Sequence, residues 1–175
     1  IDLLEQAENE TNPISRKTLL QIVVVGGGFA GVETAGEIND FINEVAEYYP
    51  SINYKDVKIT LIEATSEILS GFPQKLAMFA KDKLVERGIE VILQAGVTSF
   101  DGTEITLKSQ SESNKVLVGN LMEHRGHYKL KEITSIQSNT LIWTAGTTPI
   151  DLIKESLFKT GRGRIIVNEF LQVSQ

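Results

Sequence analysis

Cysteine is absent from this sequence of 175 residues. Its absence excludes disulfides, thiolate nucleophiles, cysteine-based metal sites and a redox-active disulfide within the chain. Long apolar runs are also missing, since none approaches the roughly 20 residues that cross a bilayer, and no signal-peptide pattern opens the sequence. We therefore expect a cytoplasmic protein.

Basic residues are in the minority, with 17 Lys and Arg against 23 Asp and Glu and a formal net charge of −6. Nucleic acids and anionic membranes are bound by clustered positive charge, so this balance argues against both partners. It leaves nucleotide binding open, because backbone amides at a helix N-terminus hold phosphates without basic side chains.

Histidine is scarce as well, with only His124 and His127, three residues apart. A helix would make this pair half of a metal site, but no further ligand lies close in sequence. Arg125, Lys129 and Lys131 surround the pair and disfavour a cation. We therefore predict no metal site and a solvated loop or hairpin at these histidines.

Apolar periodicity in the first half of the chain predicts a β-α-β-α-β order. A helix follows the glycines at 26–31, and its apolar stripe recurs at intervals of three and four until Pro50. The other predicted elements are strands Leu19–Val25, Val57–Glu63 and Ile89–Leu93 and a helix from Pro73 to Arg87.

The second half predicts a small antiparallel meander, a strand Thr140–Thr144 that returns to the main sheet, and a last strand Arg164–Val167. The meander comprises the short runs Thr103–Leu107, Val116–Val118 and Lys129–Ile133. We expect an α/β fold, a Rossmann-like parallel sheet flanked by helices with this meander attached, over residues 19–175. Residues 1–18 are interpreted as a lead-in helix and linker that is not a core element.

A glycine motif with the spacing G-x-G-x-x-G joins the first strand to its helix. In a dinucleotide site, Gly26 allows the tight turn, Gly28 lets the backbone approach the pyrophosphate, and Gly31 lets the helix pack closely on the strand. We predict that the whole segment binds the cofactor, comprising Gly26, Gly27, Gly28, Phe29, Ala30 and Gly31. The alternative is a glycine-rich turn in another α/β domain.

An acid, Glu63, ends the second strand, where it can accept hydrogen bonds from the adenosine ribose. Its distance from Gly31, 63 − 31 = 32 residues, exceeds the usual spacing of about 20, which the long helix and the loop at 50–56 account for. We predict that Glu63, with the neighbouring Ala64, binds the cofactor and prefers NADH, because a carboxylate repels the 2′-phosphate of NADPH. The alternative is a strand-end acid that faces water.

Methyltransferases that use S-adenosylmethionine share the glycine-rich turn and the second-strand acid. They usually carry an acid just before the glycines, whereas Val23, Val24 and Val25 stand there in this sequence. The methyltransferase interpretation is therefore disfavoured.

Five stretches of the chain, in order, resemble the NAD(H) domain of type II NADH dehydrogenases. These are FAD-containing NADH:quinone oxidoreductases of the pyridine nucleotide-disulfide oxidoreductase superfamily. The stretches are VVVGGGFAGVETAGE at 23–37, TLIEA at 60–64, EILSGFP at 67–73, LIWTAG at 141–146 and GRIIVNEFLQV at 163–173.

The resemblance implies that this domain binds NADH and passes hydride to FAD in a domain of the same parent chain, and that a quinone then reoxidises the flavin. It also implies that Glu33, the predicted catalytic residue, and Ala145 with Gly146 lie near the nicotinamide. Glu33 has an alternative as the first of a solvated acidic row on the helix, with Glu37, Asp40, Glu44 and Glu47.

The sequence departs from the complete family pattern, because it has one glycine fingerprint and lacks the late Gly-Asp segment for FAD and the C-terminal amphipathic helices. We therefore expect a fragment that is inactive alone, from a parent that is peripheral on the cytoplasmic face of the membrane, with a homodimer left open. The alternatives are the NADH domain of a soluble flavoprotein reductase and a non-catalytic nucleotide-binding module.

Overall fold

The computed structural model describes residues 1–111, 113–119, 128–146, 150–155, 157–161 and 164–173. The chain divides into two compact units, Ile1–Ala145 and Gly146–Gln175, and each unit is described by itself.

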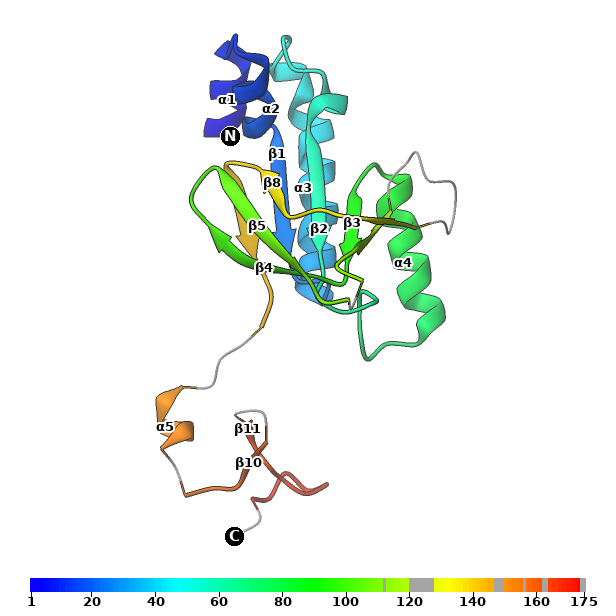
Figure 1. The fold of residues 1–175 in the computed structure, drawn as a ribbon, viewed down its shortest axis with the longest axis vertical. Coiled ribbons are helices and arrows are strands. Elements are labelled where there is room, and N and C mark those ends of the chain that lie inside the picture. Colours follow the sequence, from blue (N-terminus) through cyan, green and yellow to red (C-terminus); the bar gives the residue numbers. More distant parts are fainter. Residues whose placement is uncertain (112, 120–127, 147–149, 156, 162–163, 174–175) are drawn as a thin grey trace. The chain divides into compact units, whose positions relative to one another are not determined.

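The first unit is built on a sheet in which the described strands run in the order β7-β6-β3-β2-β1-β9 (Figure 1). Strands β3, β2, β1 and β9 are parallel, and β6 and β7 continue the sheet in antiparallel pairing. The apolar runs that form β1, β2 and β3 suit a parallel sheet because both of its faces are covered. The bounds are β1 Gln21–Val25, β2 Lys58–Ile62, β3 Glu90–Leu93, β6 Val116–Gly119, β7 Lys129–Lys131 and β9 Thr140–Trp143.

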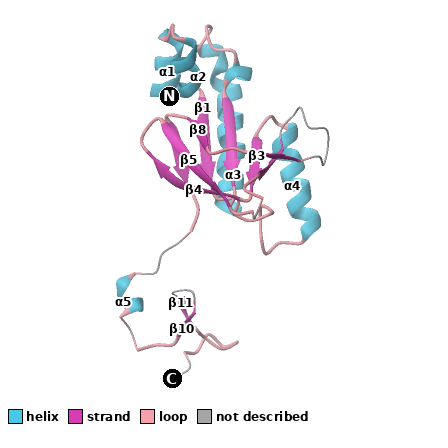
Figure 2. Cartoon of the chain, in the orientation of Figure 1, coloured by secondary structure: helices cyan, strands magenta, loops and turns pink. Residues whose placement is uncertain are grey.

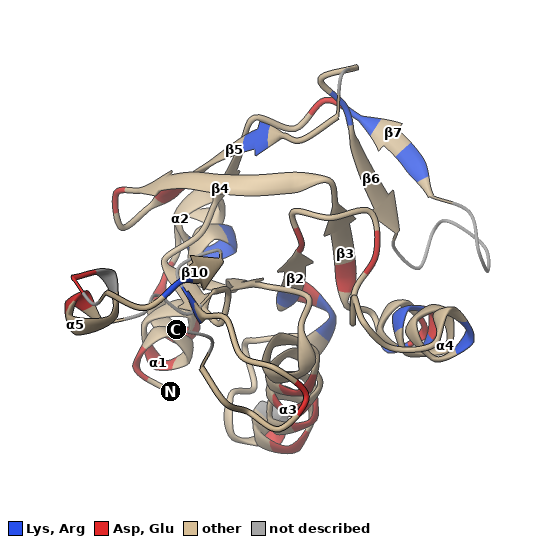
Figure 3. Ribbon diagram, turned by 90° about the horizontal axis from the view of Figure 1, so that it is seen from below, with Lys and Arg blue, Asp and Glu red and all other residues tan. Residues whose placement is uncertain are grey.

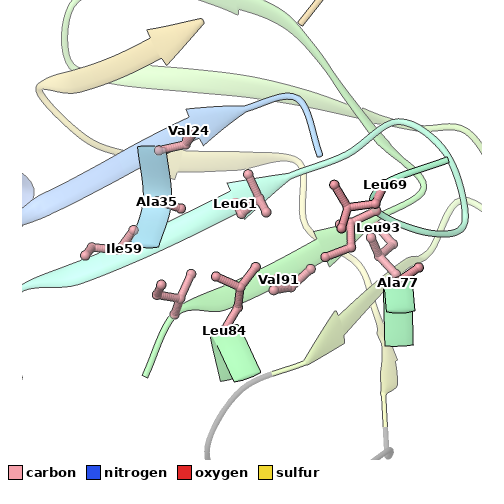
Figure 4. Packing of buried hydrophobic residues seen from close by; sticks show 11 residues of the cluster. Val24, Ala35, Ile59, Leu61, Leu69, Ala77, Leu84, Val91 and Leu93 are labelled. Atoms are coloured by element: carbon pink, nitrogen blue, oxygen red, sulfur yellow. The ribbon is translucent and has the colours of Figure 1, made fainter. Parts of the chain in front are cut away.

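Two helices, α3 (Phe29–Val45) and α4 (Gln74–Glu86), cover one face of this sheet. Ala35 of α3 and Ala77 and Leu84 of α4 are buried against side chains that point from alternate positions of the strands (Figure 4). The strand residues of this cluster are Val24, Ile59, Leu61, Val91 and Leu93. Small residues at the helix contacts allow the helices to approach the sheet closely.

The opposite face is covered by a three-stranded antiparallel sheet in the order β4-β5-β8, seen on the far side of β2 and β3 from α3 and α4 in Figure 3. Its bounds are β4 Ala95–Phe100, β5 Glu104–Ser109 and β8 Ser135–Gln137. Ile105 and Leu107 of β5 pack with Val23, Val25 and Ile92 of the main sheet. A second core cluster therefore fills the space between the two sheets.

The predicted fold class is confirmed, but the composition of the meander was wrong. Of the three runs assigned to it, only the one in β5 belongs to the small sheet, whereas β6 and β7 extend the main sheet through the pairing of β6 with β3. Strands β4 and β8 were not predicted. Edge pairing is decided by partners distant in sequence, which local periodicity does not reveal.

The N-terminal segment forms two helices, α1 (Asp2–Asn9) and α2 (Pro13–Leu19). Asn12 caps α2, because its side chain accepts hydrogen bonds from the backbone N–H groups of Ile14 and Ser15. Leu4 and Ala7 are buried in a third cluster, together with residues of α3 and its following loop. The expectation that residues 1–18 contribute nothing to the core is therefore wrong.

Two short 3-10 helices, at Ala46–Tyr48 and Tyr54–Asp56, lie between α3 and β2. The second unit, taken by itself, contains α5 (Asp151–Lys154) and a two-stranded antiparallel pair of β10 (Thr160–Gly161) and β11 (Arg164–Ile165) (Figure 2). An isolated antiparallel bridge joins Val167 to Val173. Among the described helices, none combines the length and the apolar character that a membrane crossing requires.

Candidate functional site

The turn between β1 and α3 brings the first predicted glycine against the end of β9. Gly26 has a φ of +110°, which side chains rarely adopt, and its N–H donates to the carbonyl of Ile62 over 2.8 Å. A Cβ on Gly26 would lie 2.8 Å from Thr144 Oγ1 and 2.9 Å from Ala145 Cα. Conformation and space both require glycine here.

Close packing explains the last glycine of the motif. A Cβ on Gly31 would lie 1.7 Å from the carbonyl oxygen of Gly26, so any side chain would push α3 away from the turn. Thr144 supports the same turn from β9, because its Oγ1 donates to the Val25 carbonyl over 2.8 Å. The sequence predicted no role for Thr144, although it lies within the LIWTAG stretch at 141–146.

Gly28 differs from the other glycines of the motif, because no atom of the described residues occupies the space beside it. A Cβ on Gly28 would meet no atom within 4 Å, and its φ lies outside the positive range. Gly28 is exposed and stands directly before α3, where its carbonyl accepts from Val32 N–H over 3.1 Å. The fold alone therefore gives no reason for glycine at this position.

The N-terminus of α3 opens into this free space. The N–H groups of the first helical turn, at Phe29 and Ala30, have no acceptor within the helix, and the aligned peptide dipoles place partial positive charge there. Both residues are exposed, and the ring of Phe29 stacks on that of Phe72 with the centroids 6.2 Å apart. The turn and helix end can thus hold an anion such as a diphosphate.

Glu63 lies beside the glycine turn, as a half-buried residue one position beyond β2. Its Oε2 accepts from Gly27 N–H over 2.6 Å, and its Oε1 accepts from Thr65 N–H over 2.8 Å. Thr65 Oγ1 lies 2.9 Å from the same Oε1. The carboxylate that was predicted to bind a ribose is therefore held next to the predicted diphosphate position.

Gly27 contacts Glu63, because its N–H donates to that carboxylate. The Gly27 carbonyl accepts a hydrogen bond from Leu69 N–H over 2.7 Å. Neither contact was visible in the sequence, and Thr65 was not singled out there. Ala64 is exposed next to Glu63. The assignment of these residues to the cofactor stays a prediction.

The end of β9 carries the second predicted segment. Ala145 is half-buried beside Gly26, and its carbonyl accepts from Trp143 Nε1 over 2.6 Å. Gly146 is the first residue of the second unit and has a φ of +72°, a conformation that favours glycine. Its predicted place beside the nicotinamide stays a prediction.

Glu33 lies in the second turn of α3 with its side chain exposed, as do Glu37, Asp40 and Glu44 farther along the helix. Asp40 forms an ion pair with Arg87 at the end of α4, and Arg87 also donates to the Gly36 carbonyl over 3.3 Å. Asp40, one of the residues in this acidic row, thus links α3 to α4 through Arg87. The catalytic assignment of Glu33 stays a prediction.

Within the described ranges, no group of three or more His, Asp or Glu residues has an arrangement that could hold a metal ion. His124 and His127, for which a loop or hairpin was predicted, lie outside the described residues.

A parallel sheet, a glycine turn into a helix N-terminus and an acid at the end of the neighbouring strand together define a Rossmann-like α/β domain. The family model described as pyridine nucleotide-disulphide oxidoreductase matches residues 2–175. The chain therefore belongs to the pyridine nucleotide-disulphide oxidoreductase family, as the sequence resemblance implied.

Curated relatives include an external alternative NAD(P)H-ubiquinone oxidoreductase B3 of Arabidopsis thaliana mitochondria, 32% identical over 99% of this chain. The mitochondrial external NADH-ubiquinone oxidoreductase 2 of Saccharomyces cerevisiae is 30% identical over 97%. Among solved structures, NDH2 from Plasmodium falciparum in complex with NADH has a TM-score of 0.70 and 27% identity over 89% of this chain. The chain spans 27% of the Arabidopsis protein, 29% of the yeast protein and 28% of the Plasmodium chain.

Proposed function

We propose that this chain is the NAD(H)-binding part of an FAD-dependent NADH:quinone oxidoreductase of the type II NADH dehydrogenase kind. One observation carries the proposal: Gly28 stands at the N-terminus of α3 beside space that no described residue occupies, and the Glu63 carboxylate accepts a hydrogen bond from the neighbouring Gly27. A bound diphosphate at that point supplies the reason for a residue without a side chain.

The residues present fit the nicotinamide dinucleotide as follows. The backbone of Gly28, Phe29 and Ala30 holds the diphosphate at the helix N-terminus. The Glu63 carboxylate accepts hydrogen bonds from the ribose hydroxyls of the adenosine half and repels a 2′-phosphate, so NADH is preferred. Ala145 and Gly146 border the nicotinamide half, with Glu33 as the predicted catalytic residue.

The nicotinamide supplies a hydride, which in the parent protein passes to the flavin. We propose that residues 19–175 form the nucleotide-binding domain and residues 1–18 the lead-in to it, with FAD held by another domain of the same parent chain and a quinone as the final acceptor. Support comes from the relatives named above, which are oxidoreductases of ubiquinone and several times longer than this chain. The chain alone positions NADH and is inactive.

The location and assembly of the parent belong to the same proposal. We propose a parent held peripherally on the cytoplasmic face of a membrane, while the named plant and yeast relatives are mitochondrial proteins. We also propose that the parent protein forms a homodimer, and sedimentation velocity of the parent tests this.

The test of the binding proposal is a titration of the 175-residue chain with NADH, NAD⁺, FAD and S-adenosylmethionine. Trp143 is the single tryptophan and ends the strand beside β1, so quenching of its emission reports binding near the turn. NADH and NAD⁺ should quench saturably, and calorimetry should give one site. Binding of S-adenosylmethionine without NADH would refute the proposal, and oxidation of NADH by an FAD-loaded parent separates an enzyme from a nucleotide-binding module.

A further inference from the structure

The backbone of Glu63 is fixed from both sides before any ligand arrives. Its N–H donates to the Ile92 carbonyl over 2.8 Å, and its carbonyl accepts from Ala95 N–H over 3.1 Å. Glu63 thus continues the pairing of β2 toward the end of β3 and the start of β4. The position of its Cα is determined by the sheet, and only the side chain remains to be oriented.

Thr65 provides two of the donor groups that face the Glu63 carboxylate, its N–H at 2.8 Å and its Oγ1 at 2.9 Å, both at Oε1. Thr65 is itself anchored, because its carbonyl accepts from Gln94 N–H over 2.9 Å. The hydroxyl also lies 2.8 Å from the Glu67 carbonyl, and of these two acceptors the charged carboxylate binds a hydrogen more strongly. Thr65 is exposed, so replacing its side chain leaves no cavity in the core.

These contacts restrict the Glu63 carboxylate at both oxygens, with Gly27 N–H at Oε2 and Thr65 at Oε1. A side chain as long as glutamate loses considerable rotamer entropy when a ligand orders it. A carboxylate that is ordered beforehand avoids this loss, and it cannot turn away from an approaching phosphate.

We propose that Thr65 is a positioning residue that holds the Glu63 carboxylate in place and thereby sets both the affinity for NADH and the discrimination against NADPH. This inference rests on the proposed function. Thr65 touches no part of the nucleotide in this proposal and acts only through Glu63.

The test compares Thr65→Val, which keeps the shape and removes the hydroxyl, with Thr65→Ser, which keeps the hydroxyl. NADH and NADPH are each titrated into the 175-residue chain. Because Thr65 acts only through Glu63, loss of its hydroxyl should weaken NADH binding in Thr65→Val by roughly two- to tenfold, the net effect of one ordinary hydrogen bond. NADPH binding should change less, because the freed carboxylate can move away from the 2′-phosphate, so the preference for NADH falls.

Three controls accompany this comparison. Thr65→Ser should stay within about twofold of the wild type for both ligands, as should Ser66→Ala, an exposed change in the same turn. In a Glu63→Gln background, Thr65→Val should change the NADH preference no further, since coupled residues are not additive.

The outcomes separate the two levels of the proposal. If the wild-type chain binds neither NADH nor NAD⁺, the proposed function fails. If the wild type binds NADH but Thr65→Val keeps its affinity and preference, only the role of Thr65 is overturned. An equal loss of NADH and NADPH affinity in Thr65→Val also overturns it, because that pattern indicates a damaged turn.

Discussion

Replacing Gly28 by alanine separates the fold of the turn from its ligand. The added methyl group meets no atom of residues that the structure describes within 4 Å, and the backbone at Gly28 does not require positive φ. At the position before a helix, alanine is less favourable than glycine by a few tenths of a kcal/mol up to about 1 kcal/mol. Gly28→Ala should therefore fold, with a loss of at most about 1 kcal/mol in the free energy of unfolding.

Its effect on the nucleotide should be much larger. A methyl group at Gly28 displaces the diphosphate from the helix N-terminus, which costs the dipole interaction and at least one charge-assisted hydrogen bond, together about 2 to 4 kcal/mol. Affinity for NADH should fall by roughly 30- to 1000-fold. Quenching of Trp143 emission and calorimetry measure the affinity, and urea denaturation measures the free energy of unfolding.

Two other glycines serve as matched controls. Gly36→Ala lies inside α3, where its Cβ would be 3.8 Å from Arg87 Nη1, so it should stabilise the helix by about 0.5 to 1 kcal/mol without affecting NADH. Gly31→Ala should destabilise the fold, because its Cβ collides with the Gly26 carbonyl. If Gly28→Ala binds NADH within twofold of the wild type, the diphosphate does not lie over Gly28 and the reasoning is refuted.

Three further changes test the rest of the structure. Leu4→Ala should lower the free energy of unfolding by about 2 to 3 kcal/mol, because Leu4 is buried. Ile14 is 77% exposed, so Ile14→Ala should change this free energy by less than about 0.5 kcal/mol. Equal losses for the two variants in urea denaturation would contradict the buried role of α1. Glu63→Gln should reduce the preference for NADH over NADPH roughly tenfold in paired titrations, because the negative carboxylate no longer faces the 2′-phosphate. An unchanged ratio of the two affinities would contradict the role of Glu63 in this preference. Hydrogen bonds from the backbone N–H groups of Glu104 and Thr103 lower the pKa of Asp101 below its ordinary 3.8, so its stabilisation is present above that pH and is lost as the pH falls through the lower folded-state value. Asp101→Asn should accordingly lose less stability between about pH 6 and about pH 3, and a loss equal to that of the wild type would exclude this carboxylate as the cause.

The glycine motif predicted where the turn lies in the chain but not which atoms surround its residues. Spacing and context placed Gly26, Gly28 and Gly31 at a strand-to-helix turn, and the structure has them there. The motif predicted a different task for each glycine, but it could not name the atoms that impose these tasks, because those atoms belong to neighbours that the spacing does not specify. Thr144 and Ala145 constrain Gly26, and the Gly26 carbonyl constrains Gly31, whereas no atom in the described part of the chain constrains Gly28.

The sequence by itself determined the β-α-β-α-β order and the fold class, because continuous apolar runs and helical periodicity are local properties that survive in any arrangement of an α/β sheet. Only the tertiary structure decided that β6 and β7 join the main sheet, that α1 and α2 pack on α3, and that Thr65 and Gly27 both donate to Glu63. Edge pairing and side-chain hydrogen bonds arise between residues that come together only after the chain has folded. Local pattern therefore predicts the elements, and the packing of distant segments decides their contacts.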